Sequence, residues 1–195
     1  MADLVLTDQS QLLIQLISLL DNGFASYTAN PYNASRPLPD GLTSARAFQP
    51  RQQGANVTAT VYVNALDPRP VGFTKRVDKW DAVNNVMLHT ESQRFESTYH
   101  IEALVPQSPA APTAMTEIDV LNVARFILQS SATIETLRPL NVGVMRVGQL
   151  RSSYIDDDKE QNENVPFFEI VFTHRTGVTQ ATPIIDQFDT VFARV

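Results

Sequence analysis

The chain has 195 residues, 43% of them hydrophobic and 18% charged, which is the size and composition of one globular domain spanning residues 1–195. Its formal net charge of -6 disfavours a protein that binds nucleic acid over a broad surface, because such surfaces carry clustered positive charge. The sequence has no cysteine, which excludes disulfides, thiol nucleophiles, thiolate zinc sites and iron–sulfur clusters.

The N-terminal residues carry no basic segment ahead of an apolar run. The first apolar run, residues 12–20, is only nine residues long and is interrupted by Gln15 and Ser18. Neither a signal peptide nor a membrane span is expected from this pattern. We therefore expect a protein made and used without crossing a membrane.

The first predicted element is a helix over residues 8–21. Its apolar residues recur at spacings of three and four: Leu12, Leu13, Leu16, Ile17 and Leu20. Thr7 or Asp8 can cap its start, and Asn22 followed by Gly23 predicts its end. From residue 27 to residue 54, prolines alternate with polar residues and no apolar period survives, which predicts a long extended loop.

Two strands are predicted next, because residues 57–65 and 95–105 alternate between apolar and polar side chains. One buried face and one solvent-exposed face are typical of an antiparallel sheet. The intervening residues 66–93 are predicted as a second loop arm, a charged connection within which residues 83–91 can add a short strand.

A second helix is predicted from the capping box of Thr116 and Asp119 to about residue 130, with a shorter helical turn at 132–137. Residues 142–151 and 165–173 are predicted strands separated by an acidic loop, and residues 188–195 a last strand. Gly143 and Gly148 predict a bulge or a close backbone approach in the first of these. The element order favours an α+β fold, with a mainly antiparallel sheet, two principal helices packed on one face, and long extended loops.

Common catalytic and metal-binding signatures are absent from the sequence. His89, His100 and His174 do not have the spacing of helical metal ligands. The acidic loop fails the pattern of a calcium-binding EF-hand, because Gln161 and Phe167 occupy the positions that need glycine and a carboxylate. We expect no catalytic residue, no cofactor, no metal site and no enzymatic activity.

The C-terminal half resembles the tail terminators, or neck terminators, of tailed bacteriophages. The residues that carry the resemblance are Asp119–Arg125, Leu128–Ser130, Ile134–Arg138, Gly143–Arg151, Asp156–Asp158, Pro166–His174 and Thr182–Asp186. The N-terminal helix and the segment from Arg46 to Gln53 are similar more weakly. The resemblance covers most of the chain and is most specific from about residue 116 onward.

The resemblance implies a structural virion protein rather than an enzyme. Tail terminators of this kind form a hexameric ring on the head-proximal end of the tail tube, end tail growth and join the tail to the head connector. The implied partners are other copies of the chain, the tail tube protein, the sheath protein and a connector or stopper protein. Genomic DNA passes through the lumen without specific binding. The implied location is the virion neck, after synthesis in the host bacterial cytoplasm.

A subunit interface is predicted on the matched residues, because a ring contact presents different patches of each subunit to its neighbour. Charge-assisted hydrogen bonds around the ring are expected from Arg146, Arg151, Asp156, Asp157 and Asp158, with Arg46 and Arg51 completing the interface. The arms at 27–54 and 66–93 are expected to contact tube, sheath or connector.

Two alternatives remain at this point. The first is another neck component, such as a stopper or connector adaptor. The second is a small enzyme or ligand-binding domain that uses His100 or His174 with nearby carboxylates.

Overall fold

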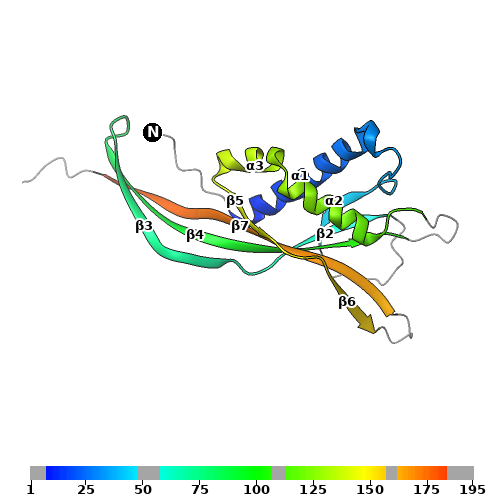
Figure 1. The fold of residues 1–195 in the computed structure, drawn as a ribbon. Helices are drawn as coiled ribbons and strands as arrows, with labels where there is room; N and C mark the ends of the chain where they lie inside the picture. The colour runs from blue at the N-terminus through cyan, green and yellow to red at the C-terminus, as the bar shows by residue number, and fades with distance from the viewer. Residues whose placement is uncertain (1–7, 48–57, 107–112, 157–161, 184–195) are drawn as a thin grey trace, which may run out of the picture.

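The computed structural model describes residues 8–47, 58–106, 113–156 and 162–183. In these residues the helices lie on one face of a seven-stranded sheet (Figure 1). The helices are α1 (Gln9–Ala29), α2 (Glu117–Gln129) and α3 (Ser131–Leu137), with the short 3-10 turns η1 (Pro31–Asn33) and η2 (Arg138–Leu140). The strands are β1 (Thr43–Arg46), β2 (Thr60–Ala65), β3 (Arg69–Asp81), β4 (Val86–Leu104), β5 (Gly143–Val147), β6 (Arg151–Asp156) and β7 (Asn162–Pro183).

The sheet is mixed but mostly antiparallel, which confirms the predicted α+β class. The main path runs β1-β2-β4-β7-β5, and only β1 and β2 are parallel to each other. β3 pairs with β4 beside β2, and β6 pairs with β7 beside β5. The two longest strands, β4 and β7, therefore form the spine to which the other strands attach.

The spine is an unbroken ladder of seventeen residue pairs, from Val86 opposite Pro183 to Glu102 opposite Phe167. Its inner part carries the helices, whereas its outer part extends beyond them together with β3 (Figure 1). We call this three-stranded extension the arm; it consists of β3, residues 86–94 of β4 and residues 175–183 of β7.

The core lies between the helices and the inner half of the spine. Its largest fully buried side chains are Tyr99, Phe168, Phe172, Leu12, Leu16, Leu20, Ile101, Leu121, Leu128, Leu137, Ile170 and Val61. Tyr99 and Phe172 meet edge to face with ring centroids 5.8 Å apart. The predicted strand face of residues 95–105 is thus the face that packs under the helices.

The first helix is longer than predicted, because Asn22 and Gly23 do not end it. A side chain at Gly23 would collide with Ile127 of α2, so this glycine serves the close crossing of the two helices. Phe24 is buried and Tyr27 half-buried, and they continue the apolar stripe to Ala29. The predicted loop from residue 27 is further shortened by β1, and residues 48–54 of it lie outside the described residues.

The predicted loop at 66–93 is wrong over residues 69–81, which form β3, whereas the strand allowed at 83–91 is present from Val86 as the first part of β4. Both faces of β3 are largely exposed, so no alternation of apolar and polar residues marks it. Pro70 and the charged residues of β3 are compatible with a strand that pairs on one side only. Asn85, with a φ of 55°, makes the turn at the tip.

The second half of the chain follows the predicted order more closely. The capping box is present: the Asp119 amide donates to Thr116 Oγ1 at 3.4 Å, and the Thr116 amide donates to Asp119 Oδ2 at 3.1 Å. Within the predicted strand at 142–151, β5 occupies residues 143–147. Arg151 begins β6, which continues to Asp156 into the predicted acidic loop. The strand predicted at 165–173 is the middle of the longer β7, and the strand predicted at 188–195 lies outside the described residues.

Candidate interaction surface

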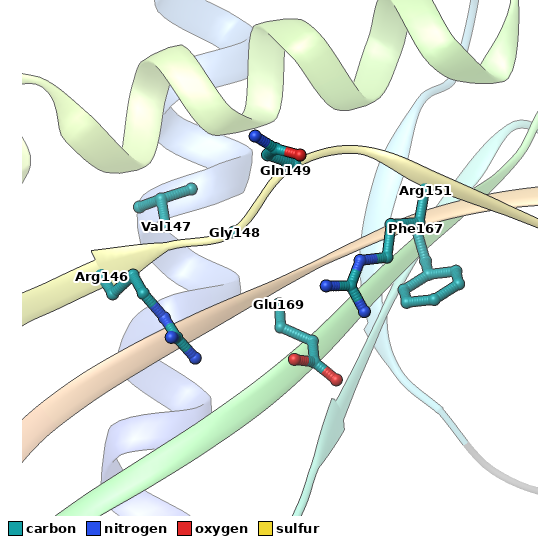
Figure 2. A pocket seen from close by; sticks show the side chains of 7 residues that line it. All are labelled: Arg146, Val147, Gly148, Gln149, Arg151, Phe167 and Glu169. Carbon is teal, nitrogen blue, oxygen red and sulfur yellow. The ribbon is translucent and has the colours of Figure 1, made fainter.

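The predicted arginines Arg146 and Arg151 line one hollow of about 260 Å³, on the edge of the sheet where β5 ends and β6 begins (Figure 2). Its other lining residues are Val147, Gly148, Gln149, Phe167 and Glu169. Both arginine side chains are exposed. The structure therefore brings together two of the predicted interface residues.

Gly148 shapes this hollow by bringing the chain against β7. Its amide donates to the Glu169 carbonyl oxygen at 2.6 Å. A Cβ at Gly148 would stand 3.0 Å from that same oxygen, closer than a side chain ordinarily comes. The close backbone approach predicted from this glycine is thus confirmed. Gly148 lies between Arg146 and Arg151 along the edge of the sheet.

The hollow also contains a carboxylate of the same subunit. The Glu169 side chain lies between Arg146 and Arg151 in the close view (Figure 2). No described ion pair joins it to either arginine within 4.0 Å. The hollow combines two cations with one anion, a mixed surface suited to polar contact with another protein.

The remaining predicted interface residues are not gathered at this hollow. Arg46 ends β1, which lies at the opposite end of the strand order from β5. Asp156 is the last residue of β6, at the far end of that strand from Arg151. Arg51, Asp157 and Asp158 lie outside the described residues.

A larger groove, of about 590 Å³, was not predicted from the sequence. It is lined by Arg94, Ile134, Arg138, Asn141, Val142, Gly143, Thr173, His174 and Arg175. Its three arginines come from β4, η2 and β7, elements far apart in the chain. Arg94 and Arg175 could have been placed together only from the β4–β7 register, which a sequence pattern does not supply.

The three histidines lie in different surroundings. His174 is 4% exposed, and its Nε2 lies 2.8 Å from the hydroxyl of Ser97, which is 0% exposed. His100 stacks on Phe167 with ring centroids 4.4 Å apart. A serine buried this completely is not accessible to a substrate, so the Ser97 and His174 pair has the geometry of a packed polar contact.

The third histidine belongs to a polar cluster on the arm. His89 Nδ1 lies 2.7 Å from Asp78 Oδ1, and Arg76 Nε donates to the same oxygen at 3.2 Å. The hydrogen bond with His89, then that with Arg76, lowers the pKa of Asp78 below its usual range. Among the described residues no group of three or more His, Cys, Asp or Glu is arranged to hold a metal ion.

The family of the chain follows from its sequence match. Residues 11–184 match the family described as E217 gateway protein gp29. The chain belongs to this family. The match begins within α1 and ends just after β7, so it spans the whole described fold. No curated protein sequence matches the chain.

Membership in this phage gateway family supports a structural role in the head–tail neck of a virion. It agrees with the resemblance to phage neck proteins at that level. Within the described part of this gateway-family protein, no helix has the length and apolar character to cross a membrane.

Proposed function

We propose that this gateway-family protein forms a hexameric ring that caps the head-proximal end of the tail tube, ends tail growth and joins the tail to the head connector. The observation that carries the proposal is the family match over residues 11–184. The resemblance of residues 116–186 to tail terminators gives the ring and its position on the tube.

The shape of the subunit supports assembly with neighbours. The arm extends beyond the helices, and β3 pairs with β4 only, within the residues described (Figure 1). The arm also exposes large apolar side chains, among them Phe73 at 98% and Val178 at 73%. Unpaired strand edges and exposed apolar groups are typical of surfaces that another protein covers.

The charged hollow of Figure 2 is the proposed contact of one subunit with the next. Arg146 and Arg151 lie on an exposed sheet edge, and β6 leads from there to the acidic run beginning at Asp156. Arg46, at the opposite edge of the sheet, is proposed to add contacts, as is Arg51. In this proposal residues 27–54 and the arm contact the tube, sheath or connector proteins.

The proposed role toward DNA is passive. Each subunit carries a net charge of -6, so a ring of such subunits repels a polyanion wherever acidic residues face its channel. Genomic DNA would then slide through without specific binding. No step of the proposed function requires a catalytic residue, a metal or a cofactor.

The test is electron microscopy of the purified full-length protein, alone and on purified tails. We expect class averages with six-fold symmetry and a central hole, and density for the ring at the head-proximal end of the tail. A ring that binds the head connector and not tails would favour a stopper or connector adaptor. A stable monomer that binds a small ligand would instead favour the ligand-binding alternative.

A further inference from the structure

The larger groove concentrates positive charge that the fold itself brings together. Arg94 and Arg175 are directly opposite each other in the β4–β7 ladder, and Arg138 of η2 lines the same groove. Like charges directly opposite each other destabilise a pair of strands. Three arginines gathered in one groove of an acidic chain form a site suited to an anionic partner.

The described part of the subunit supplies no counter-charge at this groove. No carboxylate lines it, and none of the three arginines forms an ion pair with another described residue. Glu96 stands two positions from Arg94 on β4 and is not paired with it. In the smaller hollow, by contrast, Glu169 lies between Arg146 and Arg151. An anion that binds in this groove therefore comes from outside the described part of the subunit.

The sequence contains a segment of matching charge. Residues 156–163 hold five carboxylates and a single lysine, the densest acidic run in the chain. Arginine forms strong, paired hydrogen bonds with carboxylates, so this acidic segment is chemically complementary to the three-arginine groove.

The acidic segment cannot reach the groove of its own subunit. Along β7, Asn162 and His174 are twelve residues apart, which is about 40 Å of strand. The five residues between β6 and β7 span about 18 Å even when fully extended. In Figure 1, β6 lies at the end of the molecule away from the arm, whereas α3 lies nearer to the arm. Only a second copy can place this segment in the groove.

We propose that the acidic segment, residues 156–163, of one copy docks in the groove of Arg94, Arg138 and Arg175 of a second copy. The contact joins two different patches, so it is heterologous and can be repeated from subunit to subunit until a ring closes. The inference rests on the proposed function because it names the contact that builds the proposed ring.

A charge-swap experiment tests this contact in the full-length protein. One variant carries Arg94→Glu and Arg175→Glu, a second carries Asp157→Lys and Asp158→Lys, and a third carries all four changes. We expect native mass spectrometry to show roughly tenfold or greater loss of ring in the first two variants and its recovery in the third. Unchanged ring in the first two, or no recovery in the third although circular dichroism and melting show folded protein, would overturn the proposal.

Cross-linking supplies a second measurement, because the chain has no cysteine of its own. Ile134→Cys, at the groove, is combined with Asp158→Cys in one chain. We expect a ladder of disulfide-linked multimers under mild oxidation. The matched control combines Asp158→Cys with Ala25→Cys, an exposed position on α1, and should form no disulfide-linked multimers. Equal multimers in both, or none in either, contradict the docking.

The two proposals fail in different ways. If rings form and all charge variants retain them, the docking is wrong and the ring stands. If the wild-type protein forms no rings, and the chain with Ile134→Cys and Asp158→Cys forms no disulfide-linked multimers at any concentration, both are wrong. If docked rings form but electron microscopy never finds them on tails, the contact stands and the role on the tail does not.

Discussion

Arg94 on β4 and Arg175 on β7 face each other across a continuous antiparallel ladder, with no described carboxylate paired to either. Such an arrangement costs a lone subunit about 0.2–1 kcal/mol relative to a neutral pair. In the proposed ring, this unfavourable pair of like charges would become a binding site for the acidic segment of the next subunit.

The first prediction follows from this opposition. Arg94→Gln should raise the free energy of unfolding of dilute, monomeric protein by about 0.5 kcal/mol, and the gain should shrink in high salt. Urea denaturation at low and high ionic strength measures both effects. Arg36→Gln is the control, since Arg36 pairs with Asp119 at 3.0 Å and its loss should bring no gain. A destabilised Arg94→Gln protein would contradict this account of the pair.

The second prediction concerns Gly177, where β7 approaches β4 closely. A Cβ there would collide with the Glu91 carbonyl oxygen and stand 2.8 Å from Ser92 Cα. Backbone atoms within a ladder cannot give way cheaply, so Gly177→Ala should cost about 1–3 kcal/mol. The neighbouring change Val178→Ala, at an exposed position, should stay within about 0.5 kcal/mol. Equal effects of the two changes in urea denaturation would refute the steric argument.

The third prediction concerns alkaline pH. The Tyr99 hydroxyl donates to the Gln9 carbonyl oxygen at 3.2 Å, and burial raises the pKa of this phenol above its usual 10.0. The folded state thus holds the proton more tightly than the unfolded state. Its contribution to stability is complete below pH 10 and is lost as the pH rises further.

The free energy of unfolding should therefore fall more steeply above pH 10 in the wild type than in Tyr99→Phe. At neutral pH the same variant should be less stable by about 1 kcal/mol, because the hydrogen bond to α1 is missing. Denaturant unfolding at a series of pH values measures both quantities. Parallel pH profiles for the two proteins would exclude the buried phenol as the cause.

The fourth prediction concerns the start of α2. Thr116→Ala removes the side chain that accepts from the Asp119 amide and should cost about 1 kcal/mol. The hydrogen bond from the Thr116 amide lowers the pKa of Asp119, so the stability that this carboxylate adds is lost as the pH falls below its usual range. Asp119→Asn should accordingly flatten the acid limb of the stability profile. If the free energy of unfolding of the variant falls at acid pH as steeply as that of the wild type, other carboxylates cause the loss of stability.

The fifth prediction separates folding from assembly on the arm. Phe73 is 98% exposed, so Phe73→Ser should change the free energy of unfolding by less than about 0.5 kcal/mol. If the arm contacts neighbouring proteins, as proposed, the same variant should reduce the fraction of ring or of protein bound to tails. Phe168→Ala, in the core, should instead cost about 3–5 kcal/mol. An arm variant that assembles and binds tails normally would remove Phe73 from the interface.

The sequence predicts this fold well wherever burial differs between faces. The strand from Phe95 to Val105 and the helix after Thr116 carry one apolar face each. The helix was predicted close to its observed bounds, whereas the observed strand already begins at Val86. The arm was missed because solvent reaches both of its faces, which leaves β3 without a period. Gly23 was predicted to end the first helix, but it lies within α1 and allows α2 to cross closely. The sequence pattern around Gly23 cannot show this, because the contact is with Ile127 of α2.

The candidate surface was predictable only in part, for a related reason. Arg146 and Arg151 are five residues apart, so a local pattern could find them, and they do share one hollow. Arg94 and Arg175 are eighty-one positions apart and meet only through strand register. A register of this kind depends on the pairing of whole strands, which no short motif encodes.

The length of the β4–β7 ladder also determines how the subunit responds to force. A pull along the axis of β7 loads all seventeen residue pairs in shear, so they must break together rather than one after another. Each hydrogen bond contributes little by itself, but simultaneous rupture of many raises the barrier to tearing. β7 thus forms a mechanically resistant connection from the tip of the arm to the end of the molecule at which β6 lies.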